Sequence, residues 1–175
     1  QFKIKESKNW KDTAKAISDM TVRGAGTIGA TAAFAMAQAV LLSGKKNYAK
    51  NAVMAAKAIK STRPTAHDLF FAADSVLEEV KKSSSSEEAK ARARKKALEI
   101  FDDYIVSGKK IGESGNRIIK KNSRILTHCN AGWLALVEWG SATAPIYFAH
   151  RQNKKPFVFV DETRPRLQGA RLTAW

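Results

Sequence analysis

The sequence lacks features that mark several classes of protein. It has one cysteine in 175 residues, so no disulfide can form within the chain, and a reducing compartment, the cytoplasm, is expected. That cysteine and the three histidines are widely spread and have no metal-ligand spacing, so we expect no metal and no cofactor. No apolar run approaches the roughly 20 residues that cross a bilayer, and no secretory signal is visible. An initiator methionine is also absent, so we expect upstream sequence before Gln1.

The chain has a large excess of positive charge. Its formal net charge is +15, from 31 Lys and Arg against 16 Asp and Glu. Such an excess fits a nucleic acid, an anionic membrane surface, an anionic substrate, or merely a solvated basic surface. The lysines are scattered over helical segments, and no zinc-finger, homeodomain or RNP-type signature is present. The scattered charge therefore does not predict nucleic-acid binding as the function.

Residues 1–122 are predicted to form a helical N-terminal domain. Apolar residues recur at helical spacing, and hydrophobic residues make up 44% of the chain, enough for a packed core. Ser86 is predicted to cap a helix that begins with two acidic residues. Three glycines, Gly108, Gly112 and Gly115, are predicted to weaken or break that helix. The earlier helices are expected at 8–19, 27–42, 47–60 and 66–82.

Residues 123–175 are predicted to begin a second domain. A short apolar run ends at Cys129, a mostly helical stretch covers 133–150, and a second β-rich run covers 157–160. Strand, helix and strand at this spacing indicate a parallel βαβ unit, whose ligand sites lie at the carboxyl ends of the strands. The predicted fold class is therefore α/β overall: an all-helical N-terminal region followed by the start of a Rossmann-like parallel sheet. Two strands alone do not make a stable α/β domain, so we expect a truncated sheet.

The stretch from Gly24 to Gly29 matches the pattern G-x-G-x-x-G. A dinucleotide site would need a strand before it and an acid about 20 residues later, and the sequence has neither. A glycine-rich turn that opens a helix also exposes backbone N–H groups to an anion, and Arg23 would add a bidentate phosphate donor. A tight helix start with close packing is an equal alternative. Arg63, before Pro64, is predicted at a second helix start, or else is a surface arginine before a proline turn.

Cys129 lies in the segment with the most chemical character, 127–132. A thiol at a strand end, facing a helix N-terminus, is favoured as a thiolate and can act as base or nucleophile. The alternative is an inert buried cysteine. His128 would point to the opposite face of a regular strand, so a Cys–His pair is not expected. After the second strand, the acids Asp161 and Glu162 lie beside arginines and are followed by Gln168, whose amide can bind sugar hydroxyls. A salt-bridged loop and helix start is the competing interpretation.

Taken together, these stretches resemble the methylthioribose-1-phosphate isomerase family. The resemblance runs from about residue 8 to the end of the chain. Its relatives with the same fold are ribose-1,5-bisphosphate isomerases and the regulatory subunits of the translation-initiation guanine-nucleotide exchange factor. Four motifs in the same order carry the resemblance: Thr-Val-Arg-Gly-Ala at 21–25, Ser-Thr-Arg-Pro-Thr-Ala at 61–66, Leu-Thr-His-Cys-Asn-Ala-Gly at 126–132, and Asp-Glu-Thr-Arg-Pro at 161–165 with Leu-Gln-Gly-Ala-Arg-Leu-Thr-Ala-Trp at 167–175.

The resemblance implies a reaction and a set of roles. The family opens a furanose 1-phosphate and converts this aldose to its ketose in methionine salvage. Cys129 would be the catalytic thiol, and Gln168 would contact the sugar. The phosphate end would be held by Arg23, Gly24 and Ala25, with Arg63 as a second anionic clamp. A small-molecule sugar phosphate is thus the expected ligand, and a homodimer the implied assembly.

The family's acid, an aspartate, is expected beyond Trp175 in a Gly-Ala-Asp-Arg-type stretch. We therefore predict that the 175 residues alone are inactive and need the remainder of a longer polypeptide. Two other functions stay open beside the isomerase. A regulatory subunit of translation initiation would not be expected to need Cys129, and a basic nucleic-acid-binding module would show steeply salt-dependent binding.

Overall fold

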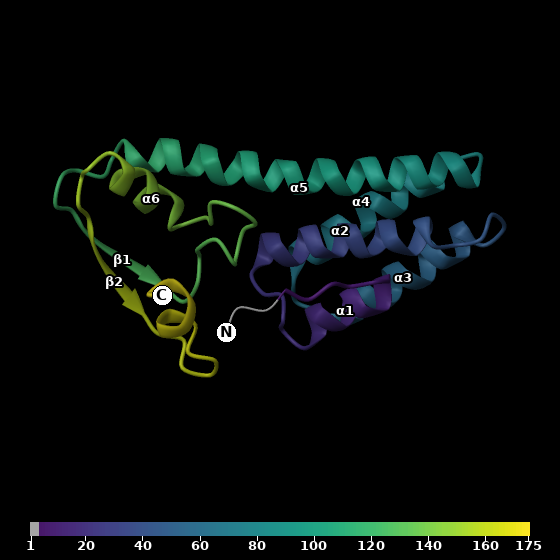
Figure 1. Cartoon of the computed structure of the whole chain (residues 1–175), viewed down its shortest axis with the longest axis horizontal. Coiled ribbons are helices and arrows are strands. Elements are labelled where there is room, and N and C mark those ends of the chain that lie inside the picture. Colours follow the sequence, from purple (N-terminus) through teal and green to yellow (C-terminus); the bar gives the residue numbers. More distant parts are fainter. Residues whose placement is uncertain (1–3) are drawn as a thin grey trace. The chain divides into compact units, whose positions relative to one another are not determined.

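A computed structural model describes residues 4–175 (Figure 1). Helices fill the first two thirds of the chain, and a two-stranded parallel sheet follows, which confirms the predicted fold class. Among the described residues, none of the helices combines the length and the apolar character needed to cross a membrane. The elements are α1 Trp10–Ser18, α2 Ala25–Leu41, α3 Tyr48–Thr62, α4 His67–Lys81, α5 Ser86–Asn116, β1 Arg124–His128, α6 Ala144–Arg151, β2 Phe157–Asp161 and the π-helix η1 Gly169–Thr173.

The chain divides into two compact units, one ending at Phe101 and the other beginning at Asp102. This division lies inside α5, whereas the change from helix to strand lies at Arg124. The domain boundary predicted at residue 122 follows the change of secondary structure, and it stays a prediction.

Helix α2 is the centre of the first unit, where it packs against α1, α3 and α4. It is rich in alanine, and small side chains let neighbouring helices approach closely. Larger apolar side chains from the surrounding helices complete the core. The largest fully buried side chains are Ile17, Met36, Val40, Ile59, Leu69, Val76 and Val80.

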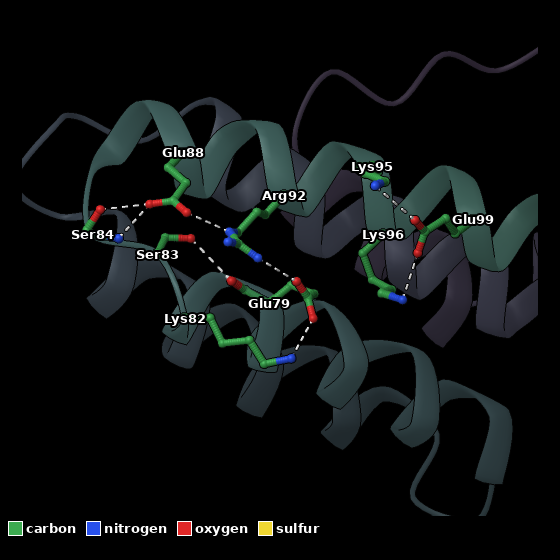
Figure 2. Close-up of polar contacts among 9 residues, drawn as sticks. All are labelled: Glu79, Lys82, Ser83, Ser84, Glu88, Arg92, Lys95, Lys96 and Glu99. Atoms are coloured by element: carbon green, nitrogen blue, oxygen red, sulfur yellow. Dashed lines mark hydrogen bonds and ion pairs between the residues drawn. The ribbon is translucent and has the colours of Figure 1, made fainter.

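The start of α5 corrects one prediction. The N–H of Glu88 donates to the Ser85 hydroxyl at 3.1 Å, so Ser85 is the capping residue and Ser86 is already helical. The Glu88 carboxylate in turn accepts from the N–H and the hydroxyl of Ser84, at 2.9 and 2.8 Å (Figure 2). This reciprocal arrangement satisfies N–H groups at the helix start, which explains why the cap lies one residue earlier than predicted.

The glycines of α5 correct a second prediction, because the helix continues through all three of them. Gly108, Gly112 and Gly115 recur at i, i+4 and i+7 and so share one face of the helix. A Cβ at 112 would lie 2.5 Å from the Phe148 ring, and one at 115 would overlap the Pro145 ring. These glycines therefore permit close packing within the second unit. The helix ends at Asn116, and a turn and loop lead from there to β1.

In the second unit, β1 and β2 pair in parallel, with Arg124 opposite Phe157 and His128 opposite Asp161. This confirms the predicted parallel pairing. The segment between the strands is less helical than predicted: residues 133–143 form turns, and only α6 is helical. Pro145 occupies the first turn of α6, and Gly140 has a positive φ of 72°, which ends any regular helix before it.

Candidate active site

Cys129 directly follows β1 and is half-buried. Its N–H donates to the Asp161 carbonyl at 3.0 Å, which extends the contact between the strand ends by one residue. Its φ is 60°, in the left-handed region that residues with a Cβ seldom adopt. The chain therefore turns sharply at the thiol, at the carboxyl end of the parallel pair, where the sequence predicts the site.

Two threonine hydroxyls hold Cys129. The Thr163 hydroxyl, in the loop after β2, donates to Sγ at 3.2 Å. The Thr173 hydroxyl, in η1, donates to the Cys129 carbonyl at 2.5 Å. Side chain and backbone of the cysteine are thus each fixed by a different residue.

The loop after the cysteine is anchored by the segment that precedes α6. The Ala131 carbonyl accepts from the Ser141 N–H at 2.9 Å and from the Thr143 hydroxyl at 3.0 Å. Gly140 lies so close that a Cβ there would be 2.6 Å from the Ala131 carbonyl oxygen and 2.7 Å from the Gly132 carbonyl carbon. Only glycine allows this approach, so the loop behind the thiol is held by backbone packing.

Glu162 fastens η1 to the loop after β2. Its carboxylate accepts from the N–H groups of Thr163 at 2.8 Å, Gly169 at 2.7 Å and Ala170 at 3.0 Å. Desolvation alone would raise the pKa of Glu162, but these backbone hydrogen bonds and the nearby Arg171 outweigh it and lower the pKa. Glu162 therefore has a structural role: its carboxylate accepts hydrogen bonds from the N–H groups at the start of η1. This agrees with the alternative interpretation of the sequence, a loop and helix start.

His128 is exposed, and its Nδ1 lies 3.8 Å from Oδ2 of Asp161. The hydrogen bond to the thiol comes from Thr163 and not from this histidine. Residues 4–175 also contain no group of three or more His, Cys, Asp or Glu side chains that could hold a metal ion.

A cleft of about 300 Å³ begins at Asn130, the residue after the thiol. Its walls are mainly apolar and aromatic, and among the described residues no charged side chain lines it. The Asn130 side chain contributes a polar group: Oδ1 accepts from the Gly132 N–H at 3.2 Å, and Nδ2 is a buried donor without a partner among the described residues. The lining residues are Asn130, Gly132, Trp133, Leu134, Tyr147, Leu172, Thr173, Ala174 and Trp175.

The predicted phosphate-binding residues open helix α2 in the first unit. Gly24 is the N-cap residue, with a φ of 90°, and Ala25 is the first helical residue. The half-buried Arg23 donates from Nη2 to the Met20 carbonyl at 3.2 Å, so its side chain is held against the turn before the helix. Helix α1 and this turn precede the glycine pattern, in place of the strand that a dinucleotide site requires.

Arg63 is the C-cap residue of α3, which corrects its predicted place at a helix start, since α4 begins only at His67. Its Nη1 is buried and has no hydrogen-bond partner among the described residues. Helices α2 and α3 pack together and are joined by the short segment 42–47, so α3 returns alongside α2 (Figure 1). The end of α3 and the start of α2 therefore lie at the same end of this helix pair, and both predicted arginines belong to that end.

Gln168 directly precedes η1 and is half-buried. It belongs to the same unit as Cys129, and Glu162 ties the start of its helix to the loop that carries Thr163. The predicted site residues thus form two groups: Arg23, Gly24, Ala25 and Arg63 in the first unit, Cys129 and Gln168 in the second.

Comparison with known proteins decides the family. Residues 21–175 match the Initiation factor 2 subunit family. The chain belongs to this family. As a family member it is 44% identical, over 178 aligned residues and 99% of its length, to a methylthioribose-1-phosphate isomerase of Acetivibrio thermocellus, of which it covers 52%.

Two solved structures of relatives have the same fold over the whole chain. The 5-methylthioribose 1-phosphate isomerase of Pyrococcus horikoshii OT3 matches with a TM-score of 0.91 and 35% identity, and half of it is covered. The translation initiation factor eIF-2B subunit delta of A. fulgidus matches with a TM-score of 0.89 and 34% identity, and 52% of it is covered. This family member thus spans about half the length of the relatives it matches.

Sequence reasoning missed the residues that position the thiol. Thr163 and Thr173 lie 34 and 44 positions after Cys129, and their contacts depend on the pairing of β1 with β2 and on the docking of η1. Both lie within the motifs that carry the resemblance, which was the available signal. The sequence of this family member shows Glu162 as an acid beside arginines, but no local pattern indicates that Glu162 fixes the start of η1.

Proposed function

We propose that this chain is part of an aldose–ketose isomerase that converts 5-methylthioribose 1-phosphate to 5-methylthioribulose 1-phosphate. The observation that carries the proposal is the placement of Cys129: a half-buried thiol at the carboxyl end of a parallel strand, held through its sulfur and its carbonyl. The proposal draws support from the 44% identity to a protein named for this activity. Sugar-phosphate isomerisation needs a group that handles hydrogen at C1 and C2, and such a thiol is suited to that role.

The six predicted site residues have distinct roles in this proposal. Cys129 is the catalytic thiol, and Gln168 binds sugar hydroxyls. Arg23, together with the backbone of Gly24 and Ala25 at the start of α2, binds the 1-phosphate, because a helix start and a guanidinium both favour an anion. Arg63 adds a second cationic group, and its buried, unpartnered Nη1 is a donor that a phosphate oxygen would satisfy.

The cleft beside Asn130 favours an apolar substituent at C5 of the sugar. Trp133, Leu134, Tyr147 and Leu172 line it, and no charged residue among those described contributes to it. A second phosphate would need cationic or multiple N–H donors, whereas a methylthio group needs only apolar surface. This supports the methylthio sugar over ribose 1,5-bisphosphate, the alternative substrate.

A regulatory subunit of translation initiation is the second candidate function. The likeness to the A. fulgidus subunit favours it, with a TM-score of 0.89. The two functions make different demands on the thiol. An isomerase requires Cys129 for turnover, while a regulatory subunit that acts by binding a partner tolerates its replacement.

A chimera tests the proposal. Residues 1–175 replace the matching half of the A. thermocellus isomerase, and the product is assayed with 5-methylthioribose 1-phosphate and ribose 1,5-bisphosphate side by side. We expect turnover of the methylthio sugar, and a loss of about 10³-fold in kcat on Cys129→Ala, the range for removal of an acid–base group. The 175-residue chain assayed alone is expected to be inactive, because it spans about half the length of the relative named for this activity.

The controls separate failure of the fold from failure of the function. Unfolding curves establish that the chimera and its Cys129→Ala variant fold equally well. Full turnover by Cys129→Ala, or no turnover by a folded chimera under conditions where the A. thermocellus parent is active, would refute the isomerase function. We further propose a homodimer in the cytoplasm as the working form, which size-exclusion chromatography and fractionation address.

A further inference from the structure

We propose that Asn130 is a further substrate-binding residue, whose side-chain amide donates from Nδ2 to an oxygen at C3 or C4 of the sugar. This inference rests on the proposed function, because it takes the occupant of the cleft to be the sugar phosphate. It concerns binding and not the chemistry of the thiol, so it is tested apart from turnover.

The neighbour of Asn130 fixes which end of its amide is the donor. The N–H of Gly132 lies 3.2 Å from one end of the amide. A backbone N–H only donates, so that end is the oxygen Oδ1 and the other end is the NH2 group. A flipped amide would set two donors against each other. The assignment of Nδ2 as a donor therefore follows from the contact itself.

The donor at Nδ2 is unused within the described part of the chain. Nδ2 is buried and has no hydrogen-bond partner there. A buried donor left unpaired costs free energy, and such groups are rare in native proteins. Asn130 also lines the cleft, and the last torsion of an asparagine side chain has a broad energy well, so the amide turns toward a group in the cleft at low cost. An acceptor that enters the cleft would satisfy this donor.

The amide lies at a polar end of an otherwise apolar cleft. A Cβ at Gly132 would lie 3.1 Å from the Tyr147 hydroxyl and 3.4 Å from Oδ1 of Asn130, so both polar groups border the space that this glycine leaves open. Thr173 adds a hydroxyl to the cleft wall, but its single hydrogen is donated to the Cys129 carbonyl at 2.5 Å. Nδ2 is thus a donor that remains available at this end.

The order of the chain places Asn130 between two parts of the proposed substrate. Cys129, the residue before it, acts at C1 and C2. Trp133 and Leu134, after it, line the apolar part of the cleft that takes the substituent at C5. The sugar atoms between these two parts are C3 and C4, and each carries an oxygen that accepts hydrogen bonds: the 3-hydroxyl, and the ring oxygen that becomes the 4-hydroxyl when the furanose opens.

The test measures binding without turnover. The chimera described above is prepared with Cys129→Ala, and calorimetry gives its dissociation constant for 5-methylthioribose 1-phosphate. Asn130→Asp in this background keeps Oδ1 for the Gly132 N–H but replaces the NH2 group by an oxygen that only accepts. We expect the dissociation constant to rise at least tenfold, because the donor is lost and an acceptor faces the sugar oxygen.

The 3-deoxy analogue of the substrate identifies the acceptor. If the 3-hydroxyl accepts from Nδ2, the analogue binds about tenfold more weakly than the substrate when Asn130 is present, and the two ligands bind Asn130→Asp within about twofold of each other. If the oxygen at C4 accepts, removal of the 3-hydroxyl changes the affinity by the same factor in both proteins. Both results support the proposal when Asn130→Asp itself weakens binding of the substrate.

Asn47→Asp is the matched control, because it makes the same change of charge at an exposed asparagine whose side chain makes no capping hydrogen bond. We expect it to bind the substrate within about twofold of the parent chimera. Unfolding curves establish that each variant folds, and Asn130→Ser takes the place of Asn130→Asp if the latter does not. Equal dissociation constants for the folded chimeras with and without Asn130 overturn the inference, while turnover by the chimera that retains Cys129 still supports the proposed function. A folded chimera that neither binds nor converts the sugar phosphate overturns both.

Discussion

At the scale of single residues, conformations that side chains rarely adopt gather around the thiol. Cys129 has a φ of 60° and Gly140 a φ of 72°, and the loop between them passes within the space that a Cβ at 140 would need. A residue with a Cβ that is held in this region, as Cys129 is, costs of order 1–3 kcal/mol, and such residues concentrate at functional sites. The backbone conformation of the loop after Cys129 is therefore held by packing within the second unit and not by the conformational preferences of the loop residues.

Gly140→Ala tests this constraint. The new Cβ would lie 2.6 Å from the Ala131 carbonyl oxygen and 2.8 Å from Cα of Gly132, and backbone atoms cannot move aside as a flexible side chain does. Together with the left-handed φ, we expect a loss of about 3 kcal/mol in the free energy of unfolding, measured by urea denaturation. Alkylation of Cys129 should also accelerate as the loop loosens.

Gly44→Ala is the matched control for that substitution. Gly44 lies in the exposed connection between α2 and α3, and a Cβ there would meet no atom within 4 Å. We expect it to change the free energy of unfolding by no more than about 0.5 kcal/mol. Equal stability of the two variants would contradict the idea that Gly140 is required by close backbone approach.

At the scale of elements, local patterns gave most of the helices. Predicted and observed bounds of α1 to α4 differ by two residues or fewer at each end, because apolar periodicity and breakers at the ends are local signals. The glycines of α5 were misjudged for a physical reason: low helix propensity is a weak cost that tertiary packing overrides. The packing partners of Gly112 and Gly115 are Phe148 and Pro145, which lie 36 and 30 positions farther along the sequence.

In the candidate site, too, some features follow from local sequence patterns and others depend on tertiary packing. The parallel strands and the thiol at their carboxyl end follow from β-rich runs and their spacing, both of which are readable in sequence. The contacts that fix the thiol depend on the register of β1 against β2 and on a π-helix, which no local pattern specifies. Sequence therefore located Cys129 but not its hydrogen-bond partner, Thr163.

The start of α5 carries a prediction about pH. The N–H of Ser84, its hydroxyl and then Arg92 donate to Glu88 and lower its pKa from 4.5 to about 2 (Figure 2). A carboxyl whose pKa is lower in the folded state stabilises the fold above about pH 4.5, and this contribution is lost as the pH falls toward 2. We expect the melting temperature of the wild type to fall more steeply between pH 5 and 2.5 than that of Glu88→Gln.

Neighbouring carboxyls provide the comparison. The pKa values of Glu79 and Glu99 are also lowered, chiefly by hydrogen bonds from Lys82 and Lys96 respectively. The wild type and Glu88→Gln therefore both lose stability in acid, and the difference between their melting temperatures reports on Glu88. Glu87→Gln is the control in the same turn, since Glu87 lies 3.8 Å from Lys45 and both side chains are largely exposed. If the melting temperatures of the wild type and Glu88→Gln fall in parallel across this pH range, Glu88 does not contribute to the pH dependence of stability.

At the scale of the whole molecule, the net charge of +15 calls for a physical role. Part of the positive charge on α4 and α5 is neutralised locally, in ion pairs such as Lys82 with Glu79 and Lys96 with Glu99, both at 2.7 Å. Figure 2 shows both pairs, together with Arg92, which donates to Glu88 and to Glu79. Positive charge dispersed among such pairs attracts anions weakly and without direction, unlike the contiguous basic stripe of a nucleic-acid-binding surface.

This arrangement predicts that nucleic acid binds only without specificity. In fluorescence anisotropy, we expect single-stranded RNA and duplex DNA of equal length to bind the chain weakly at 50 mM salt, with no preference for sequence. Binding through phosphate contacts alone falls by about 10³-fold or more between 50 and 200 mM salt, so it should vanish near physiological ionic strength. Heparin, which has the charge but no bases, should compete as well as either. An RNA that stays bound at 200 mM salt and resists heparin would mean that the charge serves recognition, and would favour the basic binding module over the isomerase.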